Sequence, residues 1–196
     1  MSGVIESKFS RSIPNGEIKD CINSLQECLA AINETPYHEV LDLNFLHQVD
    51  EVAQFISGFY REATENTSIG AMYFEMNGFA INPDLWFFNG FGFEKGGDIV
   101  DLTFETEWLE DWSAETDEFT LTGMENVQAA FSKLYRDETQ PLSVELAGEI
   151  AQCLVIARFN ELINASHKVA KGLCPELDGL PVLSTAHDWD TLCPSP

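Results

Sequence analysis

The chain has 196 residues, and 44% of them are hydrophobic, which is enough for one ordinary domain with a core and excludes a globally disordered protein. It carries 33 acidic residues and only 10 basic ones, so its formal net charge is −23. A surface of this charge repels nucleic-acid phosphates and anionic membranes and attracts cations and basic proteins. We therefore expect neither a nucleic acid nor a membrane as partner.

The expected compartment is the cytoplasm. The first twenty residues contain no apolar run of the secretory type, and no segment approaches the ~20 apolar residues of a membrane span. An odd number of widely spaced cysteines is not a disulfide framework, and this favours a reducing environment. The cysteines are Cys21, Cys28, Cys153, Cys174 and Cys193.

Two amphipathic helices are predicted in the first third of the chain, after a loose arm over residues 1–16. Apolar residues recur at helical spacing from Glu17 to Asn33 and again from about Asn44 to Thr64. Thr35-Pro36 separates them, because the residue before proline disfavours the α region. Gly58 weakens the second helix by ~1 kcal/mol relative to alanine, and we expect it to mark a close packing contact.

An antiparallel sheet of three to five strands is predicted over residues 69–108. Half of the aromatic residues lie between Met72 and Trp112. Asn77-Gly78 is typical of a tight hairpin after a first strand. The apolar run from Leu85 reaches Phe93 only if Asn89-Gly90 is a bulge; otherwise that pair is a second turn.

Two more helices are predicted after the sheet. A short helix follows Thr122, whose spacing to Glu125 fits a capping box, and ends near Tyr135. The longest helix runs from Val144 to about Lys171, with Ser143 as a candidate cap, and should cross the domain beneath the sheet. The order of elements predicts a single α+β domain over residues 1–172, followed by an irregular C-terminal tail over residues 173–196.

The strand expected from Ile99 to Trp108 alternates between apolar and acidic residues, which predicts one face on the core and one in water. No lysine or arginine occurs between Gly96 and Ser132. Exposed aromatic residues beside a row of negative charge are typical of a surface that binds a basic partner. The candidate partner-binding residues are Asp101, Glu105, Glu107, Trp108, Glu110, Asp111 and Trp112.

No residue pattern predicts catalysis, a metal or a cofactor. Cys174, His187 and Cys193 are zinc-ligand types, but they lack the paired spacing of structural zinc sites. No nucleophile elbow, zincin or Walker motif occurs, and Gly90-x-Gly92 has no helix after it. We therefore expect a binding protein rather than an enzyme.

The function these features favour is that of an acidic module that sequesters or inhibits a basic partner protein. In size, charge and fold class the chain resembles bacterial immunity proteins, and this resemblance implies a toxin as partner; a nucleic-acid mimic is a variant with the same electrostatics. One alternative is an enzyme or small-ligand binder with an aromatic pocket between Leu85–Phe93 and the long helix. Another is a subunit that buries Trp108, Trp112 and the tail in a larger assembly.

Overall fold

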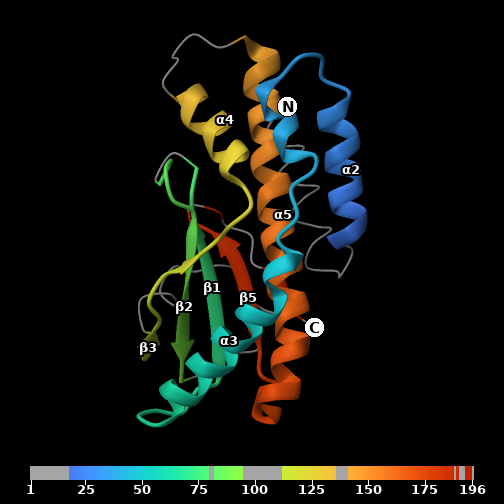
Figure 1. The fold of residues 1–196 in the computed structure, drawn as a ribbon. Coiled ribbons are helices and arrows are strands. Elements are labelled where there is room, and N and C mark those ends of the chain that lie inside the picture. Colours follow the sequence, from blue (N-terminus) through green and yellow to red (C-terminus); the bar gives the residue numbers. More distant parts are fainter. Residues whose placement is uncertain are drawn as a thin grey trace.

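The fold is that of an α+β domain, as the sequence predicted: helices pack on one face of a sheet (Figure 1). The computed structural model describes residues 18–79, 82–94, 112–135, 141–187, 189 and 193–195. Its helices are α2 (Ile18–Ala30), α3 (Val49–Thr64), α4 (Glu125–Tyr135) and α5 (Leu142–Leu173), with 3₁₀ turns η1 (Pro36–Val40), η2 (Leu46–Gln48) and η5 (Pro175–Leu177).

The sheet is mixed rather than wholly antiparallel. Its strands are β1 (Ala71–Asn77), β2 (Phe87–Phe93), β3 (Ala114–Glu115), β4 (Phe119–Thr120), β5 (Val182–Ala186) and β6 (Cys193–Ser195). In the described part of the chain the order is β3-β2-β1-β5-β6, and β4 also pairs with β2. β1 is antiparallel to β2 and parallel to β5. The predicted strand from Ile99 to Trp108 and the predicted arm over residues 1–16 lie outside the described residues.

Helix α5 is the longest element and runs the whole height of the molecule in Figure 1. Its 32 residues correspond to about 48 Å at 1.5 Å each. It begins after Pro141, which accepts backbone hydrogen bonds from Val144 and Glu145, so the predicted cap at Ser143 is not formed. Sixteen of its residues are buried, because both the sheet and the N-terminal helices pack against it.

The link between β1 and β2 is longer than the tight turn we predicted at Asn77-Gly78. β1 ends at Asn77 and β2 begins only at Phe87. Phe79 has a positive φ of 56°, and its ring packs 5.0 Å from that of Trp86. Asn77-Gly78 is typical of a hairpin, but the burial of these two aromatic rings determines the loop instead.

Gly90 lies inside β2 and allows the close approach of an aromatic ring. The register from Ala71↔Phe93 to Asn77↔Phe87 is continuous, so Asn89-Gly90 is neither a turn nor a bulge in this pair. A Cβ atom on Gly90 would lie 2.7 Å from the ring of Phe74, which is fully buried. The strand can therefore continue to Phe93 only with a residue that has no side chain at this position.

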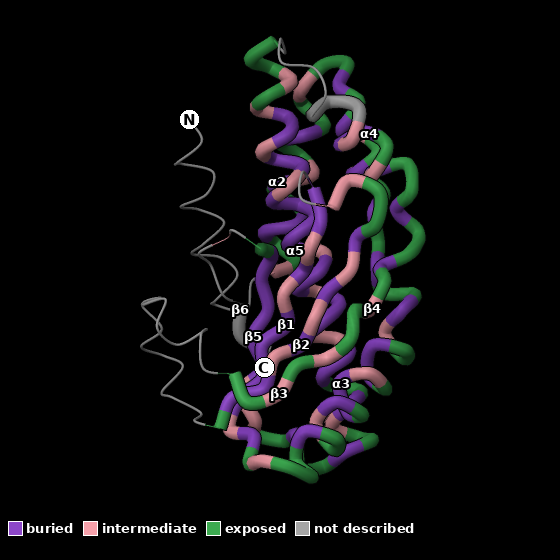
Figure 2. Tube along the Cα trace, turned by 90° about the vertical axis from the view of Figure 1, so that its left-hand side faces the viewer, coloured by how far each residue is buried: buried purple, intermediate pink, exposed green. Residues whose placement is uncertain are grey.

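One face of the sheet forms the core with α3 and α5. Met72, Phe74 and Met76 of β1 and Phe88 of β2 point to this face and are fully buried. Phe88 contacts Phe159 of α5 at a ring distance of 5.3 Å. Figure 2 shows these buried segments as a continuous region between the sheet and the helices. Burial of these methionine and phenylalanine side chains stabilises the packing of the sheet on the helices.

The segment expected to be an irregular tail contributes a central strand, so that prediction was wrong. All five residues of β5 are buried, and the strand pairs with β1 from Met72↔Val182 to Met76↔Ala186. The Ser184 hydroxyl donates a 2.6 Å hydrogen bond to the side-chain oxygen of Asn160 in α5. This bond satisfies two buried polar groups, which is how a serine is accommodated at the sheet–helix interface.

Candidate functional site

A groove of about 520 Å³ runs along one side of α3. The lining residues of this helix recur every three or four positions, so they form one stripe, and at 1.5 Å per residue the stripe is about 12 Å long. They are Phe55, Gly58, Phe59, Glu62 and Ala63, and Asn66 continues the lining just after the helix ends. Gly58 does not mark a close packing contact, as we expected, because a Cβ atom there would meet nothing within 4 Å.

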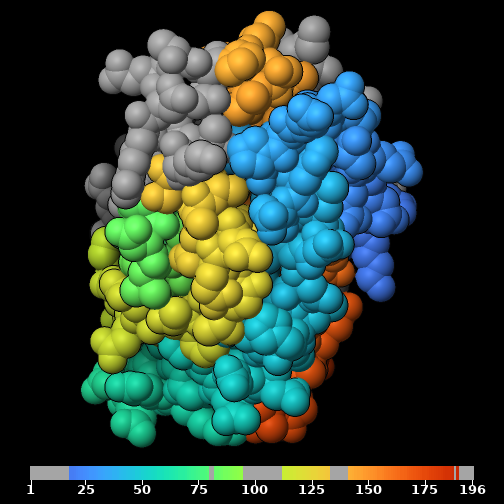
Figure 3. Space-filling view, turned by 45° about the horizontal axis from the view of Figure 1, so that its top comes forward, coloured from blue at the N-terminus to red at the C-terminus, as the bar shows by residue number. Residues whose placement is uncertain are grey.

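The second wall is the extended segment 113–117, which contains the edge strand β3. The segment is fixed to β2 by backbone hydrogen bonds from Ser113 to Gly92 and from Thr116 to Gly90. The side chain of Gln48, just before α3, accepts a hydrogen bond from the Thr122 backbone N–H. This bond ties the chain that follows residues 113–117 to the start of α3. Figure 3 shows the segment and α3 lying against each other, although they are far apart in the sequence.

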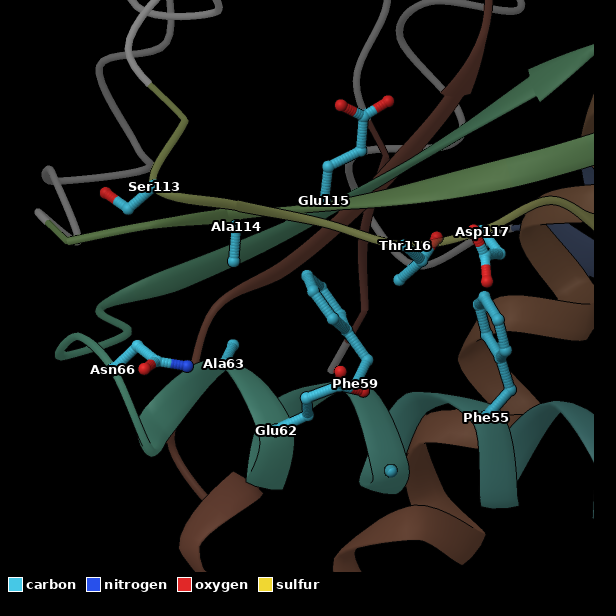
Figure 4. A pocket seen from close by; sticks show the side chains of 11 residues that line it. Phe55, Phe59, Glu62, Ala63, Asn66, Ser113, Ala114, Glu115, Thr116 and Asp117 are labelled. Atoms are coloured by element: carbon cyan, nitrogen blue, oxygen red, sulfur yellow. The ribbon is translucent and has the colours of Figure 1, made fainter.

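The floor of the groove is aromatic and its rim is acidic (Figure 4). The rings of Phe55 and Phe59 point from α3 toward the opposite wall. Asp117 also points toward α3, whereas the side chain of Glu115 points away from the groove. Glu62 is the second carboxylate that faces the groove, and among the described residues no lysine or arginine lines it. The site therefore concentrates negative potential over an apolar surface, which favours a cationic ligand with some apolar character.

Of the seven predicted partner-binding residues, the structure describes one, Trp112. It is 46% exposed, packs its ring 5.3 Å from that of Phe91, and directly precedes the groove wall at Ser113. Asp101, Glu105, Glu107, Trp108, Glu110 and Asp111 lie outside the described residues. Their role as a binding surface stays a prediction.

The pocket we considered between Leu85–Phe93 and the long helix is occupied by side chains. Phe88 and Phe159 are both fully buried and in contact there, and Phe74 packs beside them. The groove instead lies between α3 and residues 113–117, on the outer side of Phe55. The sequence contains one sign of this groove: Gly58 and Glu62 recur at helical spacing with Phe55 and Phe59 along α3.

The opposite face of the sheet holds a hydrogen-bonded group of three residues. Glu75 accepts a 2.8 Å hydrogen bond from the Tyr73 hydroxyl and lies 2.8 Å from Nδ1 of His187. Burial, and then the neighbouring Glu75, raise the pKa of Tyr73 above its usual range. Tyr73 therefore stays protonated and donates to Glu75. This cluster joins β1 to the end of β5, and we assign it a structural role.

Possible reactive groups in the described part of the chain include its metal-binding side chains and the thiol of Cys21. Among them no group of three metal-binding side chains comes together. Burial raises the pKa of the Cys21 thiol to about 11, so this thiol is not a thiolate at neutral pH. None of the helices the structure describes is long and apolar enough to span a bilayer.

No protein-family model matches the chain, and no curated protein or solved structure matches it at a significant level.

The open space at Gly58 gives a stability prediction. Replacing Gly58 with alanine should raise the free energy of unfolding by about 0.5–1 kcal/mol, because alanine restricts the unfolded chain and adds no clash in the helix. Urea denaturation measures the change. Gly90→Ala is the contrasting variant and should destabilise the protein, since its Cβ atom would press on the buried Phe74 ring. A loss of stability in Gly58→Ala would mean that the helix face is packed rather than open.

Proposed function

We propose that the protein is an acidic protein-binding module that sequesters or inhibits a basic partner protein. The observation that carries the proposal is the groove beside α3, which has an aromatic floor, the carboxylates of Glu62 and Asp117, and no basic residue among the described residues that line it. Exposed Trp112 adjoins the groove and supplies a rigid aromatic contact of the kind that anchors interfaces. The net charge of −23 attracts a basic partner from a distance and speeds association.

Asp111 and Glu110 directly precede Trp112 in the sequence, and no lysine or arginine occurs between Gly96 and Ser132. The acidic residues predicted to bind the partner therefore add to the negative charge of this part of the chain. In size, charge and fold class the chain resembles immunity proteins, which neutralise a toxin by covering its active site. The same electrostatics would suit a partner that normally binds nucleic acid.

The proposal is tested by capture from the source cell with the purified protein as bait. We expect a basic protein to be retained at about 50 mM salt and released at about 500 mM, because salt screens exposed charges. A bait with Glu62→Gln and Asp117→Asn should retain much less of it. The matched control is Glu65→Gln with Glu118→Gln, which removes the same charge from exposed residues outside the groove lining.

Retention of the same basic protein by the wild type and the control, with loss in the groove variant, supports the proposal. It is overturned if no basic protein is retained at low salt. It is also overturned if the protein retained is insensitive both to salt and to the groove variant.

A further inference from the structure

We infer that the groove beside α3 takes a short extended segment of the partner, with arginine side chains directed over Phe55 and between Glu62 and Asp117. This inference rests on the proposed function and adds the chemical class of the group that is bound. It follows from the dimensions of the groove, the edge strand along its wall and the residues that line it.

The dimensions fit an extended peptide of about five residues. The α3 stripe from Phe55 to Ala63 is about 12 Å long at the helical rise, and five residues of extended chain span about 13 Å from the first Cα to the last at about 3.3 Å per step. A helix would be a poor fit, because its diameter of about 10 Å needs a wider channel than a 520 Å³ groove of this length provides.

The wall at residues 113–117 favours the same conformation. β3 is the last strand on its side of the sheet in the described part of the chain, and it uses one edge to pair with β2. An edge strand presents backbone N–H and C=O groups to an added strand. A segment lying in the groove can therefore pair with this edge while its alternate side chains reach the floor.

The lining residues favour arginine over lysine. The guanidinium group is planar, stacks on aromatic rings and pairs with carboxylates through two parallel hydrogen bonds. Glu62 on one wall and Asp117 on the other place carboxylates on both sides of the Phe55 and Phe59 rings. Two arginines at alternate positions lie ~7 Å apart on the same side of an extended chain, which allows each wall to hold one of them.

The test uses the whole protein and a fluorescent peptide of sequence Gly-Arg-Ser-Arg-Gly, with fluorescence anisotropy as the readout. Replacing both arginines with lysine should weaken binding by about two- to fivefold, since lysine keeps the charge but cannot form the two parallel hydrogen bonds to a carboxylate or stack as a plane. Replacing them with citrulline, which is neutral and has almost the same shape, should weaken it by at least about tenfold.

Two variants of the protein test the place of binding. Gly58→Leu adds a side chain to the groove from the helix side, at a position where a Cβ atom meets nothing within 4 Å, and Glu62→Gln with Asp117→Asn removes the charge. Each should weaken binding of the arginine peptide by about tenfold or more. The controls are Gly172→Leu, which adds the same side chain at another open helix position, and Glu65→Gln with Glu118→Gln. Both controls should bind as the wild type does.

The inference is overturned if the arginine and lysine peptides bind equally and Gly58→Leu has no effect. If capture of a basic protein by the wild-type bait still succeeds, that result leaves the proposed function standing. If no peptide binds and no basic protein is captured, both fail. Thermal denaturation of each variant shows whether it is folded, and the charge variant tests the inference even if Gly58→Leu does not fold.

Discussion

Replacing Phe88 with alanine should lower the free energy of unfolding by about 3–5 kcal/mol, the usual cost of deleting a large buried ring. Phe88 is fully buried, and its ring lies 5.4 Å from that of Phe55, 5.0 Å from Phe119 and 5.3 Å from Phe159. These neighbours belong to α3, β4 and α5, so the variant removes the contact that several layers share.

Urea denaturation at neutral pH measures the loss. Leu142→Ala is the control, because Leu142 is 80% exposed at the start of α5 and its truncation should change stability by less than about 0.5 kcal/mol. A loss below about 1 kcal/mol for Phe88→Ala would contradict the packing described here.

Mild acid should destabilise the protein through His167 in α5. His167 is 1% exposed, and its pKa is lowered from 6.5 to about 4, chiefly by burial and then by the positive charge of Lys171. The unfolded chain takes up a proton on this residue near pH 6.5, whereas the folded chain does so only near pH 4. Between these values the unfolded state binds more protons, so stability falls as the pH falls.

The expected contribution of His167 is a loss of about 2 kcal/mol between pH 7.5 and pH 5, and about 3 kcal/mol by pH 4. Protonation of other groups changes stability over the same range, so the measured quantity is the difference between the wild type and His167→Gln. This variant is neutral at every pH tested. Urea denaturation at pH 7.5 and pH 5 should show a steeper loss for the wild type; equal losses would mean that His167 is accessible to protons in the folded state.

The helices were predictable because their signal is local. Apolar residues at helical spacing over Glu17–Asn33, Asn44–Thr64 and Val144–Lys171 gave α2, η2 with α3, and α5, with ends displaced by a few residues. The α+β class followed from the order of elements along the chain. Periodicity of this kind is a property of each segment alone, so no knowledge of its neighbours is needed.

The strand β5 was not predictable in the same way. Its five residues include Ser184 and Thr185, which made Val182–Ala186 resemble the turn-rich segment around it. The partner that buries it, β1, is more than a hundred residues earlier, and the pairing is parallel. The hydrogen bond from Ser184 to Asn160 explains how the serine can be buried. A bond between β5 and α5 leaves no periodic pattern in the sequence of either segment.

The groove escaped prediction for a related reason. Sequence reasoning placed negative charge near Trp112 but assigned it to one alternating strand and assigned Gly58 to a packed contact. In the structure, Gly58 and Glu62 of α3 line the same groove as Asp117, which lies on the other wall. Each wall looks ordinary by itself, since an amphipathic helix with exposed glutamates is common. Only the pairing of residues 113–117 with β2 brings the second wall to the first.

The most direct test is to map where an arginine peptide contacts the protein. Backbone amide signals of ¹⁵N-labelled protein are followed by NMR at low salt while Gly-Arg-Ser-Arg-Gly is added. We predict shifts confined to residues 55–66 and 112–117, reversed by added salt. Shifts spread evenly over the acidic surface, or centred on another element, would contradict the assignment of binding to the groove.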